Sequence, residues 1–314
     1  MQVGDVLDRG GQEVQIFFLL ERLQAEAAAS GGRVHVLNGN HESMNVSSAA
    51  RGHARFRYAT RGGLDEFARW REAQRFGACL KGRCGFAAGI CAPGDAPPPA
   101  EAPHDGSTPH APATDAASAA RAAALCPGCP LARRFLEPHP FVLTVGSTAF
   151  VHGGILSEHT TQPRDAINAA GARWLSGDHP AERTPAFLGG ERALVWARQY
   201  GHPDPSKCDC SELDAALAAM PGVARVVVGH TIQPPAVGIN SVCGGRAVRV
   251  DVGMSAGCGG FPPGVLEIVD DGKQMFRIVE GAGGLPVREA VAGPSGAKLP
   301  PPPPPPMEEE RKGG

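Results

Sequence analysis

Four short stretches of the sequence combine glycine with side chains that can bind a metal ion or a phosphate, and each follows a segment with the composition of a strand. They are Gly4–Gly10 (GDVLDRG), Gly39–Glu42 (GNHE), His152–Gly154 (HGG) and Gly229–Thr231 (GHT). Glycine lets the backbone turn sharply away from a sheet. Because strand ends in α/β proteins meet at one edge of the sheet, we expect these loops to converge on one site.

The segments between these loops have the pattern of an α/β protein. Residues 12–29 have apolar side chains at a spacing of three to four and end at Ser30-Gly31-Gly32, which predicts a helix. Val34–Leu37 has the composition of a buried strand, and Phe141–Val145 with Thr148–Val151 predicts a hairpin. Further strands are expected at Arg225–Val228, Ala247–Val252 and Val265–Val269, and a helix that begins at Ser211.

The four loops supply a set of side chains suited to a divalent metal ion. Asp5 offers a carboxylate, Asn40 an amide oxygen, and His152 and His230 imidazole nitrogens. Hard and borderline dications bind this combination of ligands. A single Gly-His or Gly-Asp pair is usually only a turn, but four in order at strand ends indicate a shared metal site.

Glycine and proline are unevenly distributed along the 314 residues. The chain has 42 glycines and 30 prolines, and the prolines concentrate near residues 93–112 and 300–306. Residues 87–125 have almost no large aliphatic side chains, so they cannot bury enough apolar surface to offset the loss of chain entropy. We therefore expect one domain over residues 1–280 with a flexible insert at about 87–125, followed by a disordered tail over 281–314.

The charge balance and hydropathy exclude some partners. A net charge of −2 gives no field of the kind that attracts nucleic acid, so a nucleic-acid partner is not expected. No stretch of about 18 apolar residues is present, and the start has no export-signal pattern, so no membrane partner is expected either. The chain thus carries no visible export or membrane signal.

The chain has nine cysteines, an odd number, and no visible secretion signal, so we expect mostly reduced thiols. Cys126 and Cys129, or Cys208 and Cys210, are spaced so that each pair could bind zinc or change redox state. Neither pair has a second pair at zinc-finger spacing.

The motifs GDxxDRG, GNHE, HGG and GH together resemble those of the calcineurin-like metallophosphoesterases, in particular the phosphoprotein phosphatase branch. The sequence is more similar still to the Shewanella-like protein phosphatases of plants and algae, in stretches such as Phe56–Thr60, Val195–Arg198, Lys207–Cys210 and Arg249–Ser255. The resemblance covers about residues 2–270 apart from the insert. It implies a two-sheet sandwich flanked by helices, a phosphorylated protein as substrate, and a cytoplasmic or mitochondrial location.

The resemblance also implies roles for individual residues. Asp5 would bridge two divalent metals (Mn, Fe or Zn), and the second metal would also bind Asn40, His152 and His230. Water activated by the two metals would attack phosphorus in line. The remaining roles would belong to His41, which protonates the leaving oxygen, to Asp8, which keeps His41 cationic, and to Arg9 and Arg198, which bind the phosphate.

One departure from the family pattern concerns the first metal. The family has an earlier GDxHG motif on its first strand, and only Met1-Gln2-Val3 precede Gly4 here. The sequence therefore predicts a fold lacking that strand and one tightly bound metal with little turnover, either in a fragment or in a degenerate relative. A dinucleoside polyphosphate hydrolase and an inactive phosphate-binding module remain alternatives, and the residues do not distinguish phosphoserine, phosphothreonine and phosphotyrosine.

Overall fold

The computed structural model describes residues 1–51, 56–76, 116–178, 184–281 and 284–291. The helices in these ranges are α1 (Glu13–Ala29), α2 (Asn40–Ala50), α3 (Arg61–Phe76), α4 (Ala116–Leu125), α5 (Arg164–Leu175) and α6 (Cys210–Ala218). The strands are β1 (Val142–Val145), β2 (Thr148–Val151), β3 (Arg225–Val228), β4 (Asn240–Val242), β5 (Ala247–Arg249), β6 (Gly264–Val269), β7 (Gln274–Glu280) and β8 (Pro286–Ala290).

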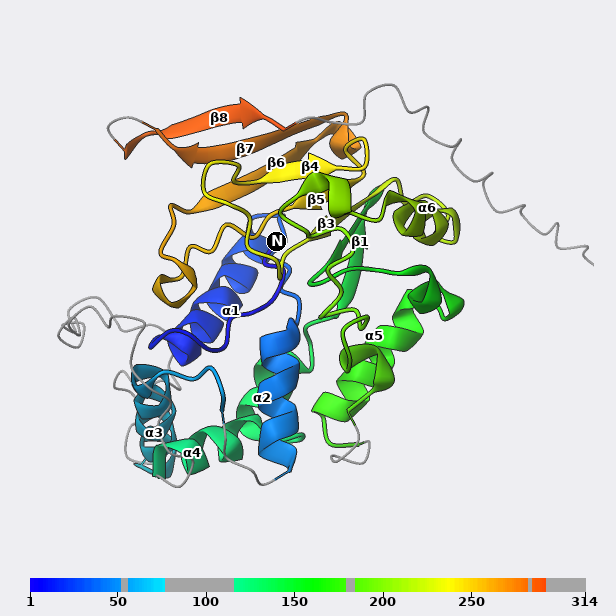
Figure 1. The fold of residues 1–314 in the computed structure, drawn as a ribbon. Helices are drawn as coiled ribbons and strands as arrows, with labels where there is room; N and C mark the ends of the chain where they lie inside the picture. Colours follow the sequence, from blue (N-terminus) through cyan, green and yellow to red (C-terminus); the bar gives the residue numbers. More distant parts are fainter. Residues whose placement is uncertain (52–55, 77–115, 179–183, 282–283, 292–314) are drawn as a thin grey trace, which may run out of the picture.

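The strands form two sheets. The first is mixed and has the order β1-β2-β3-β5-β4, in which β2, β3 and β5 run parallel while β1 and β4 pair antiparallel at the two edges. The second has the order β6-β7-β8 and is antiparallel. In Figure 1 the second sheet lies at the top and α2, α3 and α4 lie at the bottom, with the first sheet between them. The chain therefore has a mixed α/β fold with a second, antiparallel sheet.

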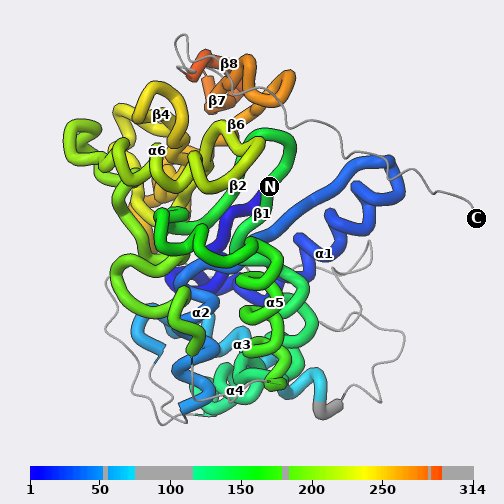
Figure 2. Tube along the Cα trace, turned by 90° about the vertical axis from the view of Figure 1, so that its right-hand side faces the viewer, coloured from blue at the N-terminus to red at the C-terminus, as the bar shows by residue number. Residues whose placement is uncertain are grey.

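Three clusters of buried apolar side chains hold these layers together. The cluster shared by both sheets includes Phe150, Val227 and Val248 from the first sheet and Met275 from the second. A second cluster joins the first sheet to α5 and α6, and a third joins α1, α3 and α4. Figure 2 shows α2, α3, α4 and α5 below the sheets in the perpendicular view. Burial of these side chains is the main force that stabilises the layers.

Helix α1 confirms the helix expected over residues 12–29. Its first turn is capped from another helix, because the Glu66 carboxylate of α3 accepts hydrogen bonds from the backbone N–H groups of Val14 and Gln15, both at 3.0 Å. Free N–H groups at a helix start favour an acidic partner. Glu66 is fully buried, and burial raises the pKa of its carboxyl to about 7, although the two N–H groups favour the charged form.

We expect Glu66 to make the protein less stable as the pH rises. A pKa of about 7 in the folded state against 4.5 when exposed means that the folded state holds this proton more tightly. The contribution to stability is fully present below pH 4.5 and is lost as the pH rises through about 7, up to about 3 kcal/mol in total. Denaturant unfolding at pH 5 and pH 8 should show that the free energy of unfolding decreases less with pH in Glu66→Gln than in the wild type. The exposed Glu72→Gln on the same helix is the control, and an identical pH dependence in Glu66→Gln and the wild type would contradict this prediction.

Two of the other expected elements differ from the structure in detail. Val34–Leu37 makes only an isolated bridge, between Val36 and Gln2, so the strand expected there is wrong. The helix expected to begin at Ser211 begins at Cys210, and the Asp209 side chain caps it by accepting from Glu212 N at 3.0 Å. The hairpin of β1 and β2 is confirmed.

The expected insert and tail are both partly wrong. Residues 116–125 of the insert form α4, whose alanines bury against the helical cluster. Residues 286–290 of the tail form β8, which pairs with β7. Residues 87–115 and 292–314, with the polyproline run, lie outside the described residues. Small side chains can still stabilise a segment when a neighbouring surface accepts them, which composition alone does not indicate.

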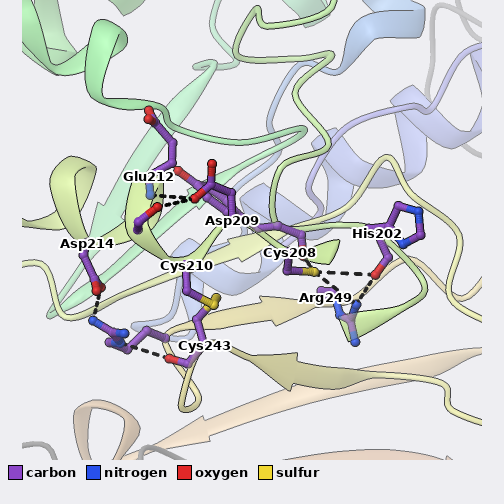
Figure 3. The surroundings of a disulfide bond; sticks show 11 residues. His202, Cys208, Asp209, Cys210, Glu212, Asp214, Cys243 and Arg249 are labelled. Atoms are coloured by element: carbon purple, nitrogen blue, oxygen red, sulfur yellow. Dashed lines mark hydrogen bonds and ion pairs between the residues drawn. A yellow bond between two sulfur atoms is a disulfide. The ribbon is translucent and has the colours of Figure 1, made fainter. Parts of the chain in front are cut away.

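The expectation of mostly reduced thiols is wrong for the cysteines that the structure describes. Cys126 bonds to Cys129, and Cys210 bonds to Cys243 rather than to nearby Cys208. Figure 3 shows the second disulfide joining the start of α6 to the turn after β4, with the free Cys208 beside Arg249. Residues 79, 84 and 91 lie outside the described ranges. Tertiary packing brings Cys210 and Cys243 to a Cα separation of 5.3 Å across 33 residues of sequence.

None of the helices in the described part of the chain has the length and apolar character needed to span a membrane.

Candidate metal centre and phosphate pocket

The structure brings the four predicted loops together at one place. Ligand atoms of Asp5, His152 and His230 all lie within 4.8 Å of one another. His152 Nε2 is 3.1 Å from Asp5 Oδ2 and 2.9 Å from Asn40 Oδ1. Asp5, His152 and His230 thus form a group that could hold a metal ion, with Asn40 at its edge.

The chemistry of these atoms fits a divalent transition metal. His152 Nδ1 donates to the Val3 carbonyl oxygen at 2.8 Å, which directs Nε2 at the oxygens of Asp5 and Asn40. His230 Nε2 is a buried nitrogen with no hydrogen-bond partner among the described residues. Burial lowers the pKa of His230 to about 3, so its imidazole is neutral. Burial opposes the charge of His152, but Asp5 outweighs it and raises the pKa of this histidine. A bound metal would replace the proton on His152.

Backbone strain concentrates at the same residues. Asp5, Asp8, Arg9 and His230 have left-handed φ angles of 62°, 75°, 60° and 63°. Such angles are unfavourable for non-glycine residues and occur preferentially at functional sites. A Cβ at Gly39 would overlap the Asp5 carboxylate, so glycine is required where these loops meet.

A buried carboxylate stabilises the strained loop. Glu42 accepts backbone hydrogen bonds from Asp5 and Val6 at 2.8 Å, from Leu7 at 3.0 Å and from Gly39 at 2.7 Å. It therefore links the Gly4–Gly10 loop to the start of α2. Glu42 lies in the GNHE motif, but the sequence does not show that it accepts hydrogen bonds from a loop 35–37 positions away.

His41 and Asp8 form a close pair beside the metal group. His41 Nδ1 donates to Asp8 Oδ2 at 2.6 Å, and the two side chains are 5% and 3% exposed. Burial disfavours the charged imidazole, but the hydrogen bond to Asp8 and the charge of Asp5 outweigh it and raise the pKa of His41. His41 therefore favours its protonated form.

A residue that the sequence analysis missed completes this pair. Arg121 of α4 is fully buried, and its Nη2 atom lies 2.9 Å from Asp8 Oδ1 and 2.7 Å from Glu13 Oε2. Its Nε atom donates to Asn45 Oδ1 at 2.9 Å, and Asn45 Nδ2 donates to Asp8 Oδ2 at 2.8 Å. Both Asp8 oxygens are thereby held. The signal in the sequence was a single arginine in the alanine-rich run AASAARAAAL.

A cavity of about 240 Å³ lies over the site, and its lining includes Asp5, His41 and His230 together with Arg9 and Arg198. Arg9 donates to Cys258 Sγ at 3.2 Å and lies 5.0 Å from the centre of the Tyr58 ring. Arg198 Nη1 donates to Thr231 Oγ1 at 2.9 Å. Both arginines predicted to bind phosphate thus line the same cavity, and Tyr58 and Cys258 are lining residues that the sequence analysis did not single out.

The fold and the site define the chain as a mixed α/β protein with a candidate metal centre. No family model matches the chain. A relative named Shewanella-like protein phosphatase 2, from Arabidopsis thaliana, is 41% identical over 271 residues, which are 86% of this chain and 66% of the relative. The chain belongs to the Shewanella-like protein phosphatases. It spans 66% of the length of that relative.

Proposed function

We propose that the chain is a metal-dependent phosphoprotein phosphatase with the two-sheet architecture of calcineurin-like metallophosphoesterases. One observation carries the proposal: the Asp8–His41 pair, two arginines and two members of the metal group, Asp5 and His230, line one cavity. The third member, His152, has a ligand atom within 4.8 Å of theirs. The name of the Arabidopsis relative supports a phosphoprotein as the substrate.

Asp5, Asn40, His152 and His230 would hold the metal. When bound, divalent metals of this kind supply Lewis-acid activation of water and of the phosphoryl group. The family pattern implies two such ions, of which this chain would bind one tightly through these four residues, because Asp5 is the one residue here that the pattern also assigns to the other ion.

The remaining steps belong to side chains of this chain. Arg9 and Arg198 bind the phosphate oxygens, for which the planar guanidinium is suited. His41, protonated and oriented through Nδ1 by Asp8, donates its Nε2 proton to the oxygen that leaves with the substrate serine, threonine or tyrosine. Asp8 keeps its position because Arg121 and Asn45 hold its two oxygens.

The proposed function is tested by comparing substrates in the presence of Mn²⁺. We expect hydrolysis of phosphopeptides to exceed that of dinucleoside tetraphosphate in kcat/KM. A clear preference for the nucleotide would instead identify a dinucleoside polyphosphate hydrolase. Binding of phosphopeptide without turnover of any of these substrates would identify an inactive binding module.

We expect His230→Ala to weaken metal binding. Removing groups that only support a ligand typically costs about 10–100-fold in metal affinity, and loss of a ligand itself should cost at least as much. Calorimetric titration of the chelator-treated protein with Mn²⁺ or Zn²⁺ measures this without any assay of activity. His202→Ala, which removes an imidazole outside the cavity lining, is the control. Equal affinities in His230→Ala and the wild type would show that His230 is not a ligand.

A further inference from the structure

A second cavity adjoins the proposed phosphate site. It measures about 500 Å³, and Asp8, Tyr58 and Trp196 line both cavities. Tyr58 packs edge-on against His41 with ring centres 5.1 Å apart, and Trp196 packs edge-on against His230 at 5.6 Å. These two aromatic side chains therefore stand between the proposed chemistry and the second cavity.

The second cavity has a positive lining. Arg51, at the end of α2, and Arg57 both line it and are exposed. Arg57 lies over the Tyr58 ring at 5.2 Å. Within the described ranges, neither arginine is paired with a carboxylate. The one acidic residue among the described lining residues is Asp8, whose oxygens are already held by Arg121 and His41.

The rest of the lining is partly polar. Helix α2 contributes Ser47 and Ser48, and Ser47 Oγ lies 2.7 Å from Thr184 Oγ1, while Met44, Phe56 and Leu188 supply apolar surface. Because one hydrogen bond joins Ser47 and Thr184, one of these two hydroxyls keeps its proton for another acceptor, such as an anion. Two guanidiniums that pair with no carboxylate in the described part of the chain, with a hydroxyl donor nearby, favour a carboxylate or a phosphate as the ligand.

We propose that this second cavity, defined by Arg51 and Arg57, is a substrate subsite for an anionic side chain that flanks the phosphorylated residue. The proposal rests on the proposed phosphatase function, because it requires the phosphate to sit in the adjoining cavity. A peptide advances by about 3.3–3.6 Å per residue when extended, so a neighbouring residue can pass the Tyr58–Trp196 wall while the phosphate remains between Arg9 and Arg198. The enzyme would thereby prefer acidic or multiply phosphorylated sequences.

The test uses phosphoserine peptides in which each flanking position carries Glu, Gln or a second phosphoserine. Wild-type protein should favour Glu over Gln at one or more flanking positions by about two- to fivefold in kcat/KM, as expected for exposed ion pairs. A second phosphate carries about −1.5 to −2 charges and should be favoured more strongly. The preference should decrease as salt is added.

The Arg51→Gln/Arg57→Gln double variant should lose this preference, and Arg173→Gln, which removes an exposed arginine from α5, should retain it. The comparison of Glu, Gln and phosphoserine peptides shows which anion the subsite takes. Equal kcat/KM for all peptides in the wild type, or a preference that survives in the double variant, would overturn the proposal.

A separate measurement keeps the subsite distinguishable from the proposed function. Turnover of p-nitrophenyl phosphate by the wild type reports on phosphatase activity alone. If it is absent, the proposed function fails, and the subsite is tested by fluorescence anisotropy with peptides that carry a non-hydrolysable phosphonate. Tighter binding of the Glu peptides, abolished in the double variant, supports the subsite, and equal binding of Glu and Gln peptides refutes it.

Discussion

Replacement of Arg121 by methionine is expected to lower the free energy of unfolding by about 3–5 kcal/mol, because it removes the cation from the buried Glu13 carboxylate and leaves the buried Asp8 carboxylate with His41 alone. Arg121 is fully buried and bridges Asp8 to Glu13. The same change frees Asp8 Oδ1, so the proposed proton donor His41 loses its orientation. We therefore expect kcat to fall while KM changes little, since Arg121 does not line the cavity.

Denaturant unfolding and steady-state kinetics measure these two effects separately. Arg121→Lys keeps the charge but not the forked geometry, so it should recover part of the stability and part of kcat. Arg173→Met on the exposed surface of α5 should change stability by no more than about 0.5 kcal/mol. Should Arg121→Met match the wild type in stability, the buried ion pairs would contribute nothing, and a change confined to KM would place Arg121 in phosphate binding.

Replacement of His41 by asparagine is expected to reduce kcat on phosphoserine peptides by about 10²–10⁴-fold, the usual contribution of a general acid. The serine alkoxide is a poor leaving group and needs a proton, whereas p-nitrophenolate leaves without one. The loss on p-nitrophenyl phosphate should therefore be much smaller. The ratio of the two losses measures the role of His41 in proton donation.

Asp8→Asn should produce the same pattern, because Asp8 orients and charges His41. The variant that carries both His41→Asn and Asp8→Asn should have about the kcat of the less active single variant, because the effects of residues that act as a unit are not additive. Metal content must be measured in each variant. A loss of equal size on both substrates would contradict a general-acid role for His41 and would indicate a defect in binding or in the metal site.

Much of the site could be predicted from the sequence because its residues occupy short motifs. Asp5, Asn40, His152 and His230 each lie beside glycine, and the structure brings them together at one place. The mixed α/β fold with parallel central strands also agrees with the order of strand, loop and helix. The expectations were wrong mainly where composition was the only guide. Residues 116–125, expected to belong to a flexible insert, form α4, and residues 286–290, expected to belong to a disordered tail, form β8.

Val34–Leu37 illustrates the limit of local pattern. Its apolar composition predicted a strand, but a strand requires a partner along its length, and in the described structure this segment makes only the bridge between Val36 and Gln2. Pairing depends on neighbours that local sequence does not specify.

The sequence by itself determined which chemistry the loops offer, because the types and spacing of residues within each motif set the available ligands, proton donors and guanidiniums. Only the tertiary structure decided which distant residues complete the site. Arg121 reaches Asp8 across 113 positions of sequence, and Arg57 shares with Trp196 the lining of the second cavity. The physical reason is that burial of apolar surface brings helices and sheets together without regard to sequence separation, and the polar groups enclosed in that process must find partners among whatever residues the packing places nearby.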